Sequence, residues 1–109
     1  MPTPAHAKNA ARTVPILAHV RDELARDGDE QETLDKAIDA VQTYRQGLDH
    51  DAEVPDYQVD KLDWRILTVA ATNLDGFTER VASNEVAFQL TMGRQILDEH
   101  IAERREGDR

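Results

Sequence analysis

Residues 29–48, with the sequence DEQETLDKAIDAVQTYRQGL, repeat apolar side chains at the spacing of an α-helix. The apolar positions are Leu34, Ala37, Ile38, Val41, Tyr44 and Leu48. Steps of three and four residues place them on one face, because an α-helix has about 3.6 residues per turn. Asp29 is followed three positions later by Glu32, a pattern typical of a helix N-terminus. We therefore predict a helix that begins at Asp29 and buries one face.

Three further segments show the same recurrence of apolar side chains. They run from about residue 14 to 27, from 56 to 75 and from 77 to 104. Thr13 is suited to cap the first of these helices, and Gly28 is suited to end it. Pro55 prevents the helix of residues 29–48 from continuing into the next segment. We expect Gly76 to separate the last two segments.

No segment alternates polar and apolar residues over the length of a β-strand. Four amphipathic segments with mostly short connections predict an all-α fold, an antiparallel bundle of four helices with a long C-terminal helix. The alternative is a three-helix core with a loosely attached first helix. We expect the bundle to span residues 13–104. Residues 1–12 would then form a weakly ordered arm or an extra helical turn, and residues 105–109 a frayed tail.

The charge of the chain bears on its partners. Its 109 residues include 22 acidic and 13 basic side chains, which give a formal net charge of −9. Such a charge repels nucleic acids and anionic lipids, so we expect no direct nucleic-acid partner and no membrane partner. No apolar run reaches about 18 residues and the N-terminus lacks a secretory signal, which favours a cytoplasmic location. Only three lysines accompany ten arginines; adaptation to a high-salt cytoplasm and a GC-rich genome explain this bias equally well.

Motifs for catalysis and metal binding are missing from the sequence. The absence of cysteine excludes disulfides, thiol nucleophiles and cysteine-based metal sites. The sequence has no glycine-rich phosphate loop, no HExxH and no GxSxG. We expect His100, with its neighbours Asp98 and Glu103, to lie on the solvated surface. Residues 49–53 resemble the start of a calcium loop but are not followed by its glycine. We therefore predict no catalytic residue, no cofactor and no metal site.

One charged side chain falls within the apolar face of each predicted helix. These residues are Arg21, Arg45, Asp63 and Glu85. Because burial of an unpaired charge is costly, each of them would need a partner. One interpretation is a polar pocket in which Asp63 and Glu85 act as acids, bases or cation ligands. The interpretation we prefer is a structural network, such as an ion pair between Arg21 and Asp63.

The last predicted helix has two apolar stripes instead of one. The first consists of Ala82, Val86, Leu90, Gly93, Leu97 and Ile101, and the second of Phe77, Val81, Phe88 and Met92. A helix needs only one stripe for its own core, so the second stripe predicts a contact surface for another subunit or a partner. The alternative is a helix that packs between two others of its own chain.

Three functions are compatible with these features. We expect a small acidic interaction or regulatory protein, a homodimer through its last helix, ahead of an enzyme. The second hypothesis is an inhibitor that mimics nucleic acid and binds a basic protein, for which Glu32, Asp35 and Asp39 supply a modest acidic row. The third is a helical-bundle enzyme or ligand sensor that uses the four charged residues named above.

Overall fold

The computed structural model describes residues 4–46 and 63–107, except for the side chains of residues 4–7. Its elements are α1 (Pro4–His19), η1 (Val20–Leu24), α2 (Gly28–Gln46), α3 (Trp64–Arg80) and α4 (Asn84–Gly107). The described residues are 92% helical and contain no strand. This confirms the predicted all-α bundle of four helices with a long C-terminal helix. No helix among these residues is long and apolar enough to cross a membrane.

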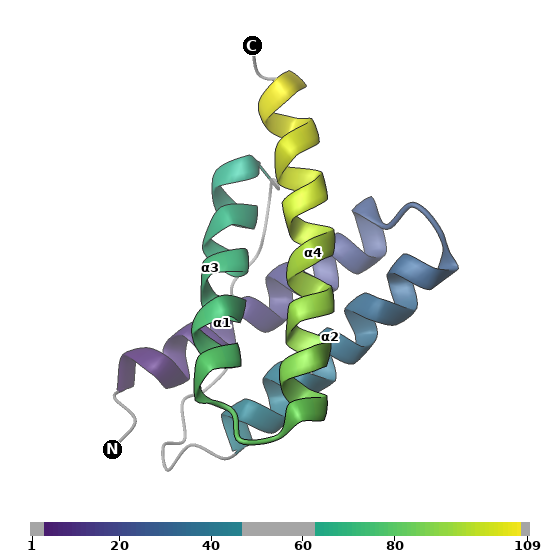
Figure 1. Cartoon of the computed structure of the whole chain (residues 1–109). Helices are drawn as coiled ribbons and strands as arrows, with labels where there is room; N and C mark the ends of the chain where they lie inside the picture. Colours follow the sequence, from purple (N-terminus) through teal and green to yellow (C-terminus); the bar gives the residue numbers. More distant parts are fainter. Residues whose placement is uncertain (1–3, 47–62, 108–109) are drawn as a thin grey trace.

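The four α-helices form two antiparallel pairs that lie across each other (Figure 1). The first pair is α1 and α2, joined by η1, a single turn of π-helix in which the N–H of Ala25 donates to the carbonyl of Val20 at 3.0 Å. The second pair is α3 and α4, joined by a short connection at residues 81–83. The first pair runs diagonally behind the second in Figure 1. In the core, α4 packs against α3 and α2, and α1 packs against α2 and α3.

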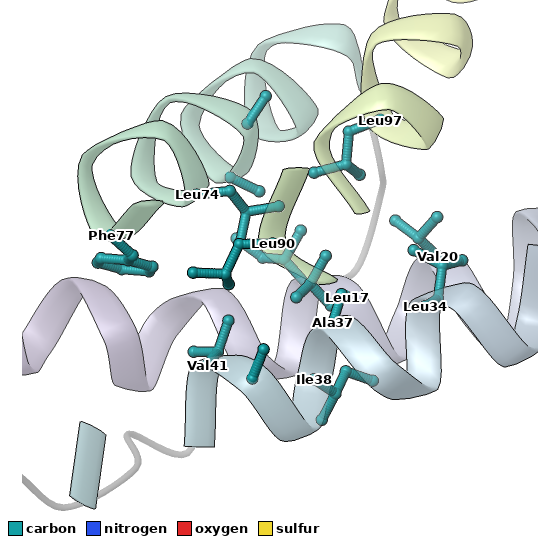
Figure 2. Packing of buried hydrophobic residues seen from close by; sticks show 14 of the residues in the cluster. Leu17, Val20, Leu34, Ala37, Ile38, Val41, Leu74, Phe77, Leu90 and Leu97 are labelled. Atoms are coloured by element: carbon teal, nitrogen blue, oxygen red, sulfur yellow. The ribbon is translucent and has the colours of Figure 1, made fainter. Parts of the chain in front are cut away.

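The core is built from aliphatic side chains of every helix (Figure 2). Its largest fully buried members are Leu17, Val20, Leu34, Val41, Leu67, Leu74, Leu90 and Leu97. The predicted stripe of residues 29–48 is confirmed for its members from Leu34 to Tyr44, all of which are buried; Leu48 lies outside the described residues. The ring of Tyr44 stacks on that of Phe77, with 4.7 Å between the ring centroids.

The two pairs come close together where α2 crosses α4. A Cβ atom added at Gly93 would lie 2.6 Å from the Cβ of Ala37. Carbon atoms in contact are normally about 3.5–4.0 Å apart, so only a glycine fits at this point of α4. On either side of this crossing the two helices diverge, which leaves room for surface hollows between them.

Several helix boundaries differ from the sequence prediction. Gly28 does not end the first helix: η1 ends at Leu24, and Gly28 is the first residue of α2, where the carboxylate of Asp27 accepts from the N–H of Glu30 at 2.8 Å. The last helix continues to Gly107, beyond the predicted end at residue 104.

The start of the first helix differs most. The first helix begins at Pro4, not near residue 14, and Pro15 lies inside it. Thr13 does not cap this helix: its hydroxyl donates to the carbonyl of Asn9 at 2.7 Å and accepts from the side chain of Asn73 at 3.2 Å. Two buried alanines, at positions 10 and 11, pack this N-terminal extension against the bundle, which explains why it is helical.

The boundary between the last two helices also lies further along the chain than predicted. Gly76 does not end α3, which continues to Arg80, and α4 begins at Asn84. Ser83 caps α4, since its hydroxyl accepts from the N–H of Val86 at 3.3 Å. A glycine inside a helix costs only about 1 kcal/mol, and burial of the next residue, Phe77, offsets that cost. The third helix was expected from about residue 56, but Asp63 is extended and α3 begins at Trp64; residues 56–62 lie outside the described residues.

Candidate functional site

The structure does not gather the four predicted charged residues into a buried cluster. Arg21, in η1, is partly exposed and donates hydrogen bonds to Asp22 at 2.9 Å and to Asp35 at 2.7 Å. The first of these bonds lowers the pKa of Asp22, and both raise the pKa of Arg21. The predicted pair of Arg21 with Asp63 is therefore wrong, because the guanidinium is used on the surface between η1 and α2.

The other three charged residues lie at helix ends. Asp63 caps α3, where one carboxylate oxygen accepts from the backbone N–H of Arg65 at 2.9 Å and of Ile66 at 3.0 Å. Arg45 lies in the last turn of α2, and Glu85 is exposed in the first turn of α4. Acidic side chains thus lie at helix N-termini and basic ones at C-termini, as the helix dipole favours. This explains why these three charged residues share a helical face with apolar ones: near the end of a helix, that face extends beyond the core and a charged side chain on it can reach solvent.

The predicted contact stripe is divided between two helices. Phe77 belongs to α3 and is 4% exposed in the monomer, because it packs on Tyr44. Val81 follows the last residue of α3 and is half-buried. Phe88 and Met92 lie on α4, as predicted. The prediction that all four share one stripe of the last helix is wrong because α3 includes Phe77 and ends only at Arg80.

Phe88 is 59% exposed on the face of α4 opposite to the core, and among the described residues only Val69, 55% exposed, is a comparably exposed large hydrophobic residue. Steps of four, three and four residues from Phe88 lead to Met92, Gln95 and Glu99, so these four residues share one side of α4. We call them the outer stripe. Met92 is half-buried, and Gln95 and Glu99 are exposed. The outer stripe therefore presents an aromatic ring beside a partly accessible thioether.

Two hollows lie between α2 and α4, one on each side of the Gly93–Ala37 crossing. The Met92 hollow, of about 260 Å³, has Met92 and Ile96 among its lining residues and a rim of Asp27, Asp29, Glu30 and Glu99. The Val86 hollow, of about 450 Å³, contains Ala40 and Val86 beside Lys36, Asp39 and Glu85. A third hollow, of about 370 Å³, adjoins it at Thr43 and Val86. The surface between α2 and α4 is therefore recessed on both sides of their crossing.

A buried polar pair joins α2 to α4. Nε2 of His100 lies 2.5 Å from Oε1 of Glu30, and Nδ1 lies 3.9 Å from Oε2 of Glu103. His100 is 5% exposed and its side chain is enclosed by the protein. The expectation that His100 lies on the solvated surface is therefore wrong: His100 follows Leu97 by three residues and shares its buried face. A substrate has little access to this ring, so the geometry favours a structural role for the pair.

Arg26 closes the same end of the bundle from the connection between η1 and α2. Its guanidinium forms an ion pair with Glu103 and lies 3.7 Å from Glu99, so it joins this connection to α4. The hydrogen bond between Arg26 and Glu103 lowers the pKa of Glu103 and raises that of Arg26. Nearer the end of α4, the guanidinium of Arg105 lies 5.0 Å from the ring centroid of Trp64 on α3. These contacts hold the C-terminal half of α4 against the bundle.

The predicted acidic row on α2 is exposed but partly neutralised. Asp35 accepts a hydrogen bond from Arg21, and Glu32 lies 3.4 Å from the ammonium of Lys36. Asp39, the third member, accepts a hydrogen bond from Thr43 only through its backbone carbonyl. Two of the three carboxylates in this row therefore face a cation of the same chain, which weakens its likeness to a row of phosphates.

Within residues 4–46 and 63–107, no group of three or more histidine and acidic side chains is arranged to hold a metal ion. The calcium-like segment at residues 49–53 lies outside these ranges. Comparison of the chain with protein-family models, with curated proteins and with solved structures found no match. The outer stripe and its flanking hollows are thus the features of the described surface on which a function can be argued.

Proposed function

We propose that the protein is an interaction module that forms a homodimer through the outer stripe of α4. The observation that carries this proposal is the exposure of Phe88. An exposed phenylalanine gives up about 1.5–3 kcal/mol of burial free energy, which contact with another molecule would recover. Met92, one turn away, extends the apolar area, and aromatic and methionine side chains are enriched at protein interfaces.

The distribution of charge supports the same surface. The whole chain has a formal charge of −9, so two copies repel each other over most orientations. Residues 86–93, VAFQLTMG, contain no charged side chain in a sequence in which 32% of residues are charged. This neutral segment includes Phe88 and Met92. Contact centred on it brings uncharged side chains together and leaves the carboxylates of Glu85 and Glu99 at its edges, whereas the exposed faces of α2 present many carboxylates.

The other hypotheses have less support. A mimic of nucleic acid needs free acidic rows, and the row on α2 is partly paired with Arg21 and Lys36. An enzyme or sensor needs convergent polar groups, and the four charged residues proposed for it are dispersed over four elements. The proposal includes residence in the cytoplasm, which suits a chain that does not depend on disulfides.

The test replaces Phe88 by Glu and, as a matched control, Val69 by Glu. Both changes put a carboxylate in place of an exposed hydrophobic side chain on a helix, but Val69 lies on α3. We expect light scattering to give the mass of two chains for the wild type and the Val69→Glu variant, and of one chain for Phe88→Glu. Circular dichroism should show unchanged helix content in all three. A wild-type monomer at high concentration, in both low and high salt, would contradict the proposal.

A further inference from the structure

We infer that the outer side of α3, together with the end of α4, binds an acidic, amphipathic segment of a protein partner. The surface consists of Trp64, Arg65 and Val69 on α3 and Arg105 on α4, and we call it the α3 patch. Its two guanidinium groups bind carboxylates of the segment, and Val69 contacts an apolar side chain beside them. This binding is separate from self-association, because Arg105 lies about a third of a turn away from the outer stripe of α4.

The two guanidinium groups of the α3 patch share one aromatic ring. α3 begins beside the last turns of α4 (Figure 1), and Cζ of Arg105 lies 5.0 Å from the ring centroid of Trp64. Cζ of Arg65 lies 5.4 Å from the same centroid. A cation–π contact attracts the positive charge to the ring and leaves N–H donors of the guanidinium for other acceptors. Two positive groups are thus held around one ring despite their mutual repulsion.

No carboxylate of the described residues forms an ion pair with either of these guanidinium groups. The ion pairs in this part of the chain use other basic side chains, namely Arg21, Arg26, Lys36, Arg94 and His100. The acidic residues that flank the patch on α3 are engaged elsewhere, since Asp63 caps the helix and Asp75 lies 2.7 Å from Arg94. The positive charge of the α3 patch is therefore left for a partner.

The α3 patch also lies in a part of the chain without acidic residues. Acidic side chains make up 22 of the 109 residues, but none occurs in residues 64–74. The exposed positions of this stretch are Arg65, Thr68, Val69 and Thr72. The helix α1, which packs against α3, contains no acidic residue either. An acidic partner that most of the molecule repels can therefore approach on this side.

Val69 supplies the apolar part of the surface. It is 55% exposed, which only Phe88 exceeds among the large hydrophobic residues that the structure describes. Val69 follows Arg65 by four residues, so the two lie on the same side of α3, about 6 Å apart along the helix axis. Tryptophan and arginine are enriched among the residues that dominate binding at protein interfaces. This combination fits a segment in which apolar and acidic side chains lie next to each other.

A protein segment fits the α3 patch better than a nucleic acid does. Trp64 is partly buried, and a base that stacked on its ring would have to displace a guanidinium. A long polyanion would also meet the field of a chain with a formal charge of −9. A short acidic segment brings few charges and places them at the arginines, and clusters of arginine are a common means of binding acidic motifs.

The test uses the fluorescence of Trp64, which is the only tryptophan of the chain and so reports on the patch directly. The probe is the peptide Glu-Leu-Glu-Glu-Leu-Glu, and the control probe has glutamine in place of every glutamate. We expect a saturable change in emission with the acidic peptide alone. The double variant Arg65→Gln, Arg105→Gln should raise its dissociation constant about tenfold, because two exposed ion pairs are lost. Val69→Thr should raise it about threefold through loss of apolar contact.

A matched control removes two positive charges outside the α3 patch. Lys8 and Arg12 are exposed on α1, and the double variant Lys8→Gln, Arg12→Gln changes the net charge equally. It should change the dissociation constant by no more than about twofold, because salt screens charges that are not in contact with the peptide. Circular dichroism should show the helix content of the wild type in every variant, since each substituted position is exposed.

Three results would overturn the inference. These are no response to the acidic peptide, equal binding of both peptides, and equal weakening by the α1 and α3 double variants. Tighter binding of a short oligothymidylate than of the acidic peptide, lost on substitution of Arg65 and Arg105, would assign the patch to nucleic acid instead. Phe88→Glu should bind the peptide as the wild type does, so failure of self-association and failure of the α3 patch are distinguishable.

Discussion

The substitution Gly93→Ala tests the crossing that positions α2, α4 and the hollows between them. In an ordinary helix this change stabilises a protein by about 0.5–1 kcal/mol, because glycine loses more backbone entropy on folding. Here the new methyl group would lie 2.6 Å from the Cβ of Ala37, about 1 Å closer than carbon atoms in contact allow. Ala37 has no rotamer through which to yield, so the helix backbones must separate. Overpacking of this kind costs about 1–3 kcal/mol, and we expect a net loss of about 1–2 kcal/mol.

Urea denaturation followed by circular dichroism measures this loss, and the chain provides a matched control. Gly76 lies inside α3, and a Cβ added there meets no atom within 4 Å. Gly76→Ala should therefore stabilise the protein by about 0.5–1 kcal/mol. Ala37→Gly combined with Gly93→Ala should be less destabilising than the sum of the single changes, because it removes the clash. A Gly93→Ala variant as stable as the wild type would refute the close crossing of α2 and α4.

Further predictions concern the polar contacts at the helix ends. Asp63→Ala should lower stability by about 1 kcal/mol in a urea titration, through loss of the α3 cap, whereas Asp63→Asn should retain most of it. His100→Ala should lower the free energy of unfolding by about 3 kcal/mol, because it leaves the carboxylate of Glu30, whose side chain is only 10% exposed, without its partner. Glu30→Gln keeps a hydrogen bond to His100 and should cost less; an equal loss from both changes would argue against this explanation. Arg26 lowers the pKa of Glu103, so the stabilisation from their pair is present above the usual carboxyl pKa and is lost as the pH falls through the lowered one. Arg26→Gln should return the pKa of Glu103 toward its ordinary value of 4.5 in an NMR titration.

The helical fold could be predicted because the spacing of apolar residues within each segment is enough to identify a helix and its buried face. The stripe from Leu34 to Tyr44 follows from helical periodicity alone, and every member of it is buried. The helix boundaries were less predictable because a glycine does not always end a helix. Gly76 lies inside α3, where the free energy gained when Phe77 packs on Tyr44 offsets the cost of a glycine in a helix. That error moved Phe77 to the wrong helix and lengthened the predicted contact stripe.

The polar contacts were less accessible to sequence reasoning because their partners are distant in the chain. His100 and Glu30 are 70 residues apart, and neither shows the other in its local pattern. One signal was present in the sequence: His100 follows Leu97 by three residues and so lies on the buried face of the helix. A buried imidazole needs a hydrogen-bond partner, which this position indicated. The misassigned charge cluster had the opposite cause. Asp63 caps its own helix and Arg21 pairs with Asp22 and Asp35 close by, so the helical projection brought together residues that the fold keeps apart.

The central claim is that the outer stripe of α4 is a surface of self-association. Amide correlation spectra of the isotope-labelled chain, recorded over a dilution series, test it at the level of single residues. We predict concentration-dependent shifts in α4 between Glu85 and Ile96, and constant positions for the exposed side of α3 around Val69. Spectra that do not change with concentration, or shifts that avoid this part of α4, would contradict the claim.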